Sequence, residues 1–152
     1  MKVQLLGIGK VREAFYKDGI EEYRKRVEKH LAIRILETPK ENSGREGDLM
    51  TAYHRVRKEH VGAQIPVACD RGGKNLSSED LARFFEQGMM DGVGLVSFLV
   101  GGPYGLAPLA LEDSKLILSL SSMTLPHQMA RLLVMEQIYR ALAIIHGEPY
   151  HK

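Results

Sequence analysis

The stretch LVSFLVGGPYGL, from Leu95 to Leu106, decides the fold of this 152-residue chain. Its first half, Leu95 to Val100, is nearly continuous in apolar residues, which is the pattern of a central parallel strand covered on both faces. Its second half changes to three glycines, a proline and a tyrosine before the final leucine. A turn alone would account for the glycines, but glycine also lets a backbone approach a ligand closely. The stretch therefore predicts a buried strand that ends in a turn or a ligand-binding loop.

Strand and helix patterns alternate on both sides of this stretch. Short apolar or alternating runs predict further strands over residues 3–8, 32–37, 65–69 and 115–120. Longer periodic runs predict helices over 11–29, 47–60, from Ser77 or Ser78 onward, and 125–146, with a loop over 39–45 and a short helix before the last strand. This alternation predicts an α/β fold in one domain, residues 1–152, with a mostly parallel sheet and helices on both faces.

Three loops leave the carboxyl ends of predicted strands, where open α/β sheets bind their ligands. They are Asp70–Lys74, Gly101–Leu106 and Ser121–Pro126. Their convergence favours a ligand-binding role for GGPYGL over a simple turn. A nucleotide-binding domain of the flavodoxin kind is disfavoured, because the glycines that follow the first strand lead to Arg12 where the dinucleotide fingerprint needs a third glycine.

Composition excludes several classes of protein. The net charge of +2 and a pI near 8.7 permit an RNA partner without the strongly basic signature of a protein that coats nucleic acid. The single cysteine, Cys69, excludes an internal disulfide and a cysteine-based zinc cluster, and the six histidines form no familiar metal motif. The sequence has no long apolar run and no signal-peptide pattern, so we expect a cytoplasmic protein that uses neither metal nor membrane.

The predicted last helix is apolar nearly all round, which requires burial on more than one side. A terminal helix usually covers one sheet face, so we expect a second copy of the chain as the other surface. Thr124 is expected to cap the helix, with Pro126 in its first turn. Glu136 and Arg140, four residues apart, form either an ordinary intrahelical ion pair or part of an active site.

Three other polar positions near the end of the chain also allow two interpretations. His127 either bonds to backbone at the helix start or belongs to an active site. Arg131 either clamps a phosphate or carboxylate or faces solvent. The terminal GEPYHK has the composition of a frayed tail, although Tyr150, His151 and Lys152 could instead stack on a base and contact phosphate.

Several stretches of the sequence resemble the SPOUT methyltransferases and, within them, the ribosomal large subunit methyltransferase H family. The stretches are FLVGGPYGL, LSLSSMTLPHQMARLLVMEQIYRA, the terminal GEPYHK, the opening MKVQLLGIGK and the central DRGGKNLSSEDLA. The resemblance covers the whole chain. It implies a C-terminal deep trefoil knot, a homodimer, and methyl transfer from S-adenosylmethionine to N3 of a pseudouridine in helix 69 of 23S ribosomal RNA on assembled ribosomes.

The resemblance also implies roles for residues of this chain. The cofactor-binding positions that match the family are Cys69, Gly101, Gly102, Leu120, Ser121, Ser122, Met123, Thr124 and Leu125. Cys69 stands where the family usually has an apolar residue such as leucine. The candidates for catalysis are His127, Arg140, Tyr150 and His151, with Arg131 and Glu136 weighed beside them.

Within this interpretation we expect the tail to reach the cofactor pocket of the partner subunit. His151 is preferred as proton acceptor because an unperturbed imidazole titrates near neutral pH. Two alternatives remain open. One is a ribosome-associated binding protein of the same fold without turnover, and the other is a methyltransferase for another RNA.

Overall fold

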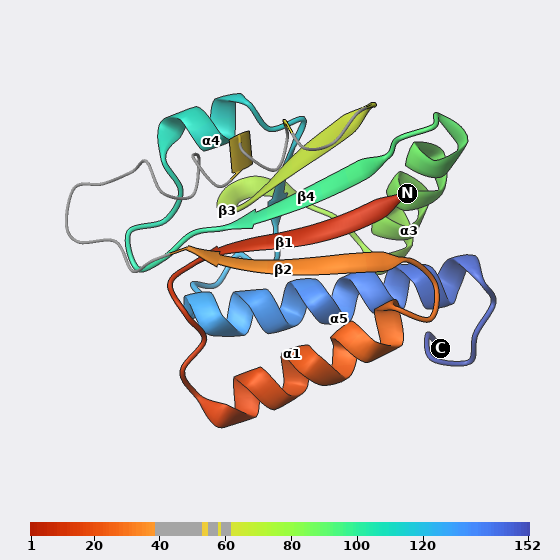
Figure 1. The fold of residues 1–152 in the computed structure, drawn as a ribbon, viewed down its shortest axis with the longest axis horizontal. Coiled ribbons are helices and arrows are strands. Elements are labelled where there is room, and N and C mark those ends of the chain that lie inside the picture. The colour runs from red at the N-terminus through yellow and green to blue at the C-terminus, as the bar shows by residue number, and fades with distance from the viewer. Residues whose placement is uncertain (39–52, 55–57, 59–61) are drawn as a thin grey trace.

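A sheet of five parallel strands, in the order β2-β1-β4-β3-β5, forms the centre of the molecule (Figure 1). The computed structural model describes residues 1–38, 53–54, 58 and 62–152. Its elements are β1 (Lys2–Ile8), α1 (Ala14–Val27), β2 (Ala32–Thr38), β3 (Gln64–Asn75), α3 (Ser78–Met90), β4 (Leu95–Val100), α4 (Pro108–Glu112), β5 (Leu116–Ser119) and α5 (His127–Ile145). The predicted α/β class and parallel sheet are confirmed.

Strand β4 lies in the middle of the sheet, as its apolar sequence predicts, and all six of its residues are buried. Phe98 pairs with Leu5 of β1 on one side and with Val67 of β3 on the other. These side chains pack toward α1, α3 and α5, and burial of a side chain the size of Phe98 contributes about 1.5–3 kcal/mol. Leu99 faces the opposite side, with Ala110 of α4, so helices cover both faces of the sheet.

Helix α5 lies between α1 and α3 on one face of the sheet (Figure 1). Its buried apolar residues are Val134, Met135, Ile138, Ala141, Leu142 and Ala143. The neighbouring helices, together with β4, cover this part of the helix, whereas the apolar residues Met129, Leu133 and Ile144 stay half-buried in the single chain. The homodimer expected from the apolar pattern stays a prediction.

Helix α3 begins as the sequence predicts. The Ser77 hydroxyl accepts a hydrogen bond from the Asp80 backbone N–H at 3.0 Å, and the Asp80 carboxylate accepts one from the Ser77 backbone N–H at 3.1 Å. This reciprocal capping box satisfies two N–H groups that the first turn leaves without helical partners.

Several element boundaries differ from the predicted ones. Helix α1 begins at Ala14 and not at residue 11, and β3 continues through the predicted loop to Asn75 after an irregularity between Cys69 and Lys74. Thr124 does not cap α5, whose N-cap is Pro126 without a side-chain hydrogen bond. The predicted loop over 39–45 lies outside the described residues, as does most of the predicted helix over 47–60. No helix in the described part of the chain has the length and apolar character needed to cross a bilayer.

Candidate cofactor site and acceptor site

The three predicted loops meet in one hollow of about 380 Å³ at the carboxyl ends of β3 and β4. Its wall combines the end of β3, the turn after β4, the segment between β5 and α5, and the first turn of α5. The lining residues are Cys69, Asp70, Arg71, Val100, Gly101, Gly102, Pro103, Gly105, Leu120, Ser121, Met123, Thr124, Leu125, His127 and Ala130. Segments more than 50 residues apart in the chain thus form one concave surface of the size that small ligands occupy.

Eight of the nine residues expected to bind a cofactor line this hollow. Ser122 is the ninth: it lies in the same loop but is not part of the wall. Residues that were not singled out also line it, notably Asp70, Arg71 and Ala130. Asp70 and Arg71 belong to a loop that the sequence had placed at this edge of the sheet. Ala130 could not be found in this way, because which side of α5 faces the hollow depends on tertiary packing.

The glycines after β4 are explained by a tight turn. The backbone N–H of Gly105 donates to the Gly102 carbonyl at 3.0 Å, and Gly105 has a φ of 81°, a conformation that glycine adopts without strain. A Cβ atom at Gly101 would lie 2.9 Å from the Gly105 Cα atom, which is too close. Gly101 is therefore required by packing of the turn, in addition to any ligand that the turn approaches.

The chemistry of the wall suits a ligand with both apolar and polar parts. Burial raises the pKa of the Cys69 thiol to about 12, so the sulfur is neutral and forms an apolar surface where a leucine would also serve. Among the polar lining residues, Arg71 donates a hydrogen bond to the Thr124 hydroxyl at 3.3 Å. The Asp70 carboxylate accepts from the Gly72 backbone N–H at 2.7 Å and so holds the loop in shape.

A second hollow of about 1020 Å³ adjoins the first. Pro103 and His127 line both hollows and stand at their junction. The remaining lining residues are Ile8, Gly9, Lys10, Val11, Arg12, Lys17, Glu37, Thr38, Tyr104 and Gln128. A ligand in the first hollow and a larger one in the second would thus meet beside the His127 side chain.

His127 is expected to be neutral at neutral pH. Burial lowers the pKa of its imidazole, and the positive charge of Arg131 lowers it further. A titration of histidine resonances by nuclear magnetic resonance, assigned with His127→Gln, should give a pKa below 6.5 for this residue. Since the unfolded chain then binds the proton more readily, the stability that His127 contributes decreases as the pH falls through 6.5. A measured pKa at or above 6.5 would contradict this assignment.

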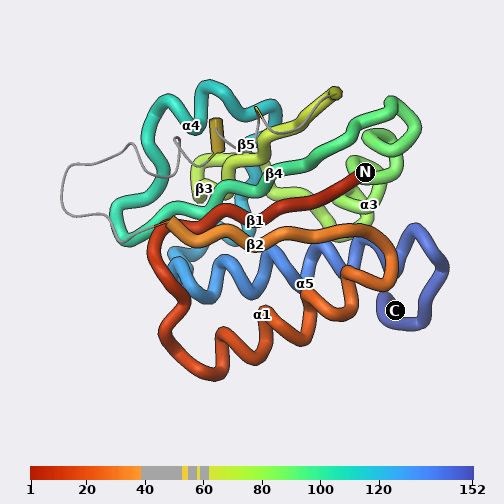
Figure 2. Tube along the Cα trace, viewed as in Figure 1, coloured from red at the N-terminus to blue at the C-terminus, as the bar shows by residue number. Residues whose placement is uncertain are grey.

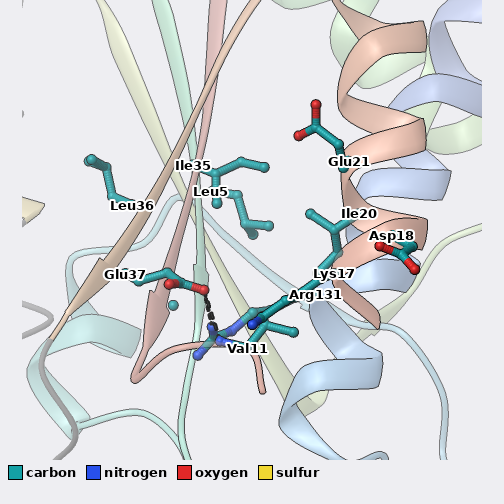
Figure 3. Close-up of a pocket in the computed structure, with 11 residues that line it drawn as sticks. Leu5, Val11, Lys17, Asp18, Ile20, Glu21, Ile35, Leu36, Glu37 and Arg131 are labelled. Atoms are coloured by element: carbon teal, nitrogen blue, oxygen red, sulfur yellow. Dashed lines mark hydrogen bonds and ion pairs between the residues drawn. The ribbon is translucent and has the colours of Figure 1, made fainter. Parts of the chain in front are cut away.

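Of the two interpretations of Arg131, exposure to solvent is wrong, and the carboxylate that the guanidinium meets is that of Glu37 within the same chain. The Arg131 side chain is 2% exposed, in a pocket of about 360 Å³ between α1 and the strands β1 and β2 (Figure 3). One guanidinium nitrogen donates to the Gly9 carbonyl at 2.8 Å and lies 3.5 Å from the Glu37 carboxylate, and the other donates to the Ile8 carbonyl. The guanidinium covers Gly7, where a Cβ atom would collide with it.

The candidates at the end of the chain form a separate cluster on α5. Arg140 bonds to Glu136 at 2.9 and 2.5 Å, which confirms the intrahelical ion pair. The Tyr150 hydroxyl donates to Glu136 at 3.0 Å, and its ring lies 4.6 Å from the guanidinium of Arg140. His151 lies 2.9 Å from the Glu79 carboxylate. The tail is therefore held against α5 and α3 of its own chain.

This cluster lies far from the hollow at the start of α5. His127 and Arg140 are thirteen positions apart on one helix, which places them about 20 Å apart along its axis. Figure 2 shows the chain end near the last turns of α5, at the opposite end from the loops that form the hollow. Of the four residues considered for catalysis, the structure thus brings only His127 to the hollow within one chain.

The sequence of this chain matches a family model along nearly its whole length. The model is described as "Predicted SPOUT methyltransferase" and matches residues 1–151. A ribosomal RNA large subunit methyltransferase H from Carboxydothermus hydrogenoformans is 39% identical over the full length of both chains. A protein of the same name from Desulforamulus reducens is also 39% identical, over all of this chain and 99% of the relative.

Solved structures show the same fold at much lower sequence identity. A probable methyltransferase from Bordetella pertussis Tohama I superposes with a TM-score of 0.58, at 11% identity, over 92% of this chain and 95% of that one. The SpoU methyltransferase AviRb from Streptomyces viridochromogenes gives a TM-score of 0.54 at 14% identity, over 96% of this chain and 61% of its own. At such identities the likeness concerns the arrangement of the chain alone.

Proposed function

Because the chain belongs to the SPOUT methyltransferases, and within them to the ribosomal RNA large subunit methyltransferase H family, we propose that it methylates ribosomal RNA of the large subunit. The observation that carries the proposal is the meeting of three sequence-distant loops in one hollow beside a larger one that opens next to it. A methyl donor in the first hollow and an RNA acceptor in the second would meet at their junction.

The finer proposal concerns the acceptor atom. We assign it to N3 of a pseudouridine in helix 69 of 23S ribosomal RNA, reached on assembled ribosomes. The names of the full-length relatives support ribosomal RNA of the large subunit as the substrate, and the modest net charge of +2 fits a protein that does not bind naked RNA through charge alone. A cytoplasmic location follows from the same substrate.

The residues of the first hollow fit S-adenosylmethionine. When bound, this cofactor supplies a methyl group already activated by a sulfonium. The apolar wall of Leu120, Leu125 and the neutral thiol of Cys69 suits the adenine ring, and the segment between β5 and α5 is free of helical and strand pairing. Arg71 offers a cation to a carboxylate, and Asp70 offers an anion to hydroxyl or amino groups. The protein has to orient the acceptor and receive its N3 proton.

We further propose a homodimer in which the tail of one subunit completes the site of the other. The separation of about 20 Å between His127 and Arg140 supports this, because Tyr150 and His151 cannot serve the hollow of their own chain from that position. In this arrangement His151 receives the N3 proton, Tyr150 holds the base, and Arg140 positions the tail. His127 is the proton acceptor available within the subunit itself.

The path of the chain near the hollow is consistent with a C-terminal trefoil knot. Strand β5 is at the edge of the sheet, whereas α5 returns to pack below β4, beside α1 and α3. The connecting segment passes the turn after β4, and both line the same hollow. We propose that this segment threads the loop formed after β4.

Methyl transfer from radiolabelled S-adenosylmethionine tests the proposed function. Three substrates are compared: assembled ribosomes that lack the modification, free large subunits and naked ribosomal RNA. Label on assembled ribosomes, mapped to one pseudouridine, is the expected result. Label on a different RNA would move the assignment to another substrate, and cofactor binding without label on any substrate would favour a binding protein of the same fold.

A further inference from the structure

Tyr104 is an exposed aromatic residue that the cofactor hollow does not use. Its side chain is 80% exposed, the largest fraction among the large hydrophobic residues of the described chain. It occupies the third position of the turn from Gly102 to Gly105, in which Pro103 fixes the second position. Its neighbours Pro103 and Gly105 line the first hollow, while Tyr104 lines the second. The turn thus directs one aromatic ring toward the larger hollow.

The same hollow carries an excess of positive charge. Lys10, Arg12 and Lys17 line it and are exposed. Its acidic lining residue, Glu37, is already engaged: its carboxylate accepts the Val11 backbone N–H at 2.9 Å and lies 3.5 Å from the Arg131 guanidinium. The three exposed cations are therefore left to attract an anionic ligand.

The loop that carries two of these cations is fixed in place by side chains from α5. The Gln128 side-chain oxygen accepts hydrogen bonds from the backbone N–H groups of Arg12 at 2.6 Å and Glu13 at 3.3 Å. Arg131 holds the carbonyls of Ile8 and Gly9, just before the loop. Helix α5 also supplies His127, so the same helix contacts the loop, the junction and the cofactor hollow.

We propose that Tyr104 is a stacking platform for an unpaired base of single-stranded RNA, whose phosphates contact Lys10, Arg12 and Lys17. Every base presents a π-face to an aromatic ring, and cations beside such a ring follow the phosphates, which is how proteins hold single-stranded nucleic acid. The junction at Pro103 and His127 then makes the stacked base a near neighbour of the base that accepts the methyl group. This inference rests on the proposed function for its RNA substrate.

Steady-state kinetics with assembled ribosomes as the RNA substrate test the stacking role of Tyr104 during turnover. Tyr104→Ala is expected to raise KM for the RNA substrate by about 5- to 150-fold, the range that corresponds to the loss of one base stack, while the affinity for S-adenosylmethionine stays unchanged. Tyr104→Phe keeps the aromatic ring and should have the KM of the wild-type chain. Tyr104→Leu keeps only apolar contact and should have a raised KM. Equal KM values for the leucine and phenylalanine variants, or no change in the alanine variant, would overturn the platform.

A fluorescence experiment tests the same platform without turnover, so it separates this inference from the proposed function. The chain has no tryptophan, and Tyr104→Trp therefore creates a single reporter. A uridine oligoribonucleotide should quench its emission and a fully paired RNA duplex should not. Met90→Trp, at a residue 70% exposed at the end of α3, is the matched control and should show no quenching. Absence of quenching at position 104, or equal quenching at both positions, overturns the proposal even if the wild-type chain methylates RNA.

The salt dependence of RNA affinity tests the proposed phosphate contacts of the basic side chains. The slope of log affinity against log salt concentration is expected to fall by about 0.7 for each phosphate contact removed from a single strand. Lys10→Gln with Arg12→Gln should therefore lower the slope by about 1.4 in total. Lys29→Gln, an exposed lysine beyond the other end of α1, is the control and should leave the slope unchanged. An unchanged slope in the double variant would remove the phosphate contacts.

Discussion

Two inactive variants of this chain are expected to regain methyl transfer when they are mixed. In the first, Tyr150→Ala and His151→Ala remove the tail side chains, and in the second, Ala130→Phe fills the cofactor hollow. Each variant alone should lose at least about 100-fold in transfer rate. The first lacks the groups that are proposed to hold the base and receive its proton, and the second lacks room for the cofactor. The measurement is radiolabel transfer to assembled ribosomes after refolding the two together.

The expected recovery is set by subunit statistics. Random exchange makes half of the dimers mixed, and each mixed dimer contains one site that combines an intact hollow with an intact tail. The recovered rate should then be about a quarter of the wild-type rate. Matching circular dichroism and unfolding midpoints must first show that both variants are folded. No recovery from folded, exchanging subunits would mean that each tail serves its own chain, against the composite site.

Replacing Arg131 is expected to have the largest effect on stability. Arg131→Met should lower the free energy of unfolding by about 2–4 kcal/mol, because the carbonyls of Ile8 and Gly9 lose their partners in a buried place and Glu37 loses its counter-charge. Urea unfolding followed by circular dichroism measures the change. Arg131→Lys should recover only part of it, since one ammonium cannot reproduce the two-pronged geometry of a guanidinium.

A surface arginine provides the matched control for this experiment. Arg83 pairs with Asp80 on α3, but its side chain is 67% exposed. Arg83→Met is expected to change the free energy of unfolding by no more than about 0.5 kcal/mol. If the methionine variants at 131 and 83 were equally stable, the buried guanidinium would have no structural role beyond that of an apolar side chain.

The sheet and the position of the hollow could be predicted because their signals are local. The apolar run from Leu95 to Val100 specifies a strand buried on both faces, and the Ser77 cap specifies the start of α3. The glycine turn after β4 and the segment after β5 follow strands that run in the same direction, so they had to meet at one edge. The long family motifs then named most residues of the wall.

The remaining features depend on contacts that no local pattern encodes. The burial of Arg131 requires two backbone carbonyls at the end of β1 and a carboxylate near the end of β2, more than 90 residues away. The start of α1 was placed three residues early because Glu37 and Gln128 hold the backbone of residues 11–13 as a loop. The packing of α5 between α1 and α3 is likewise set by tertiary structure, so the apolar pattern of the helix could not show which of its residues the same chain covers.

The contact between the Arg131 guanidinium and Gly7 also restricts the routes by which this sequence can change. An alanine at position 7 collides with the guanidinium, whereas a shorter residue at position 131 leaves two buried carbonyls without donors. A bulkier residue 7 should therefore be tolerated better together with a shorter residue 131 than alone, so the effects of the two substitutions on stability are expected to be non-additive.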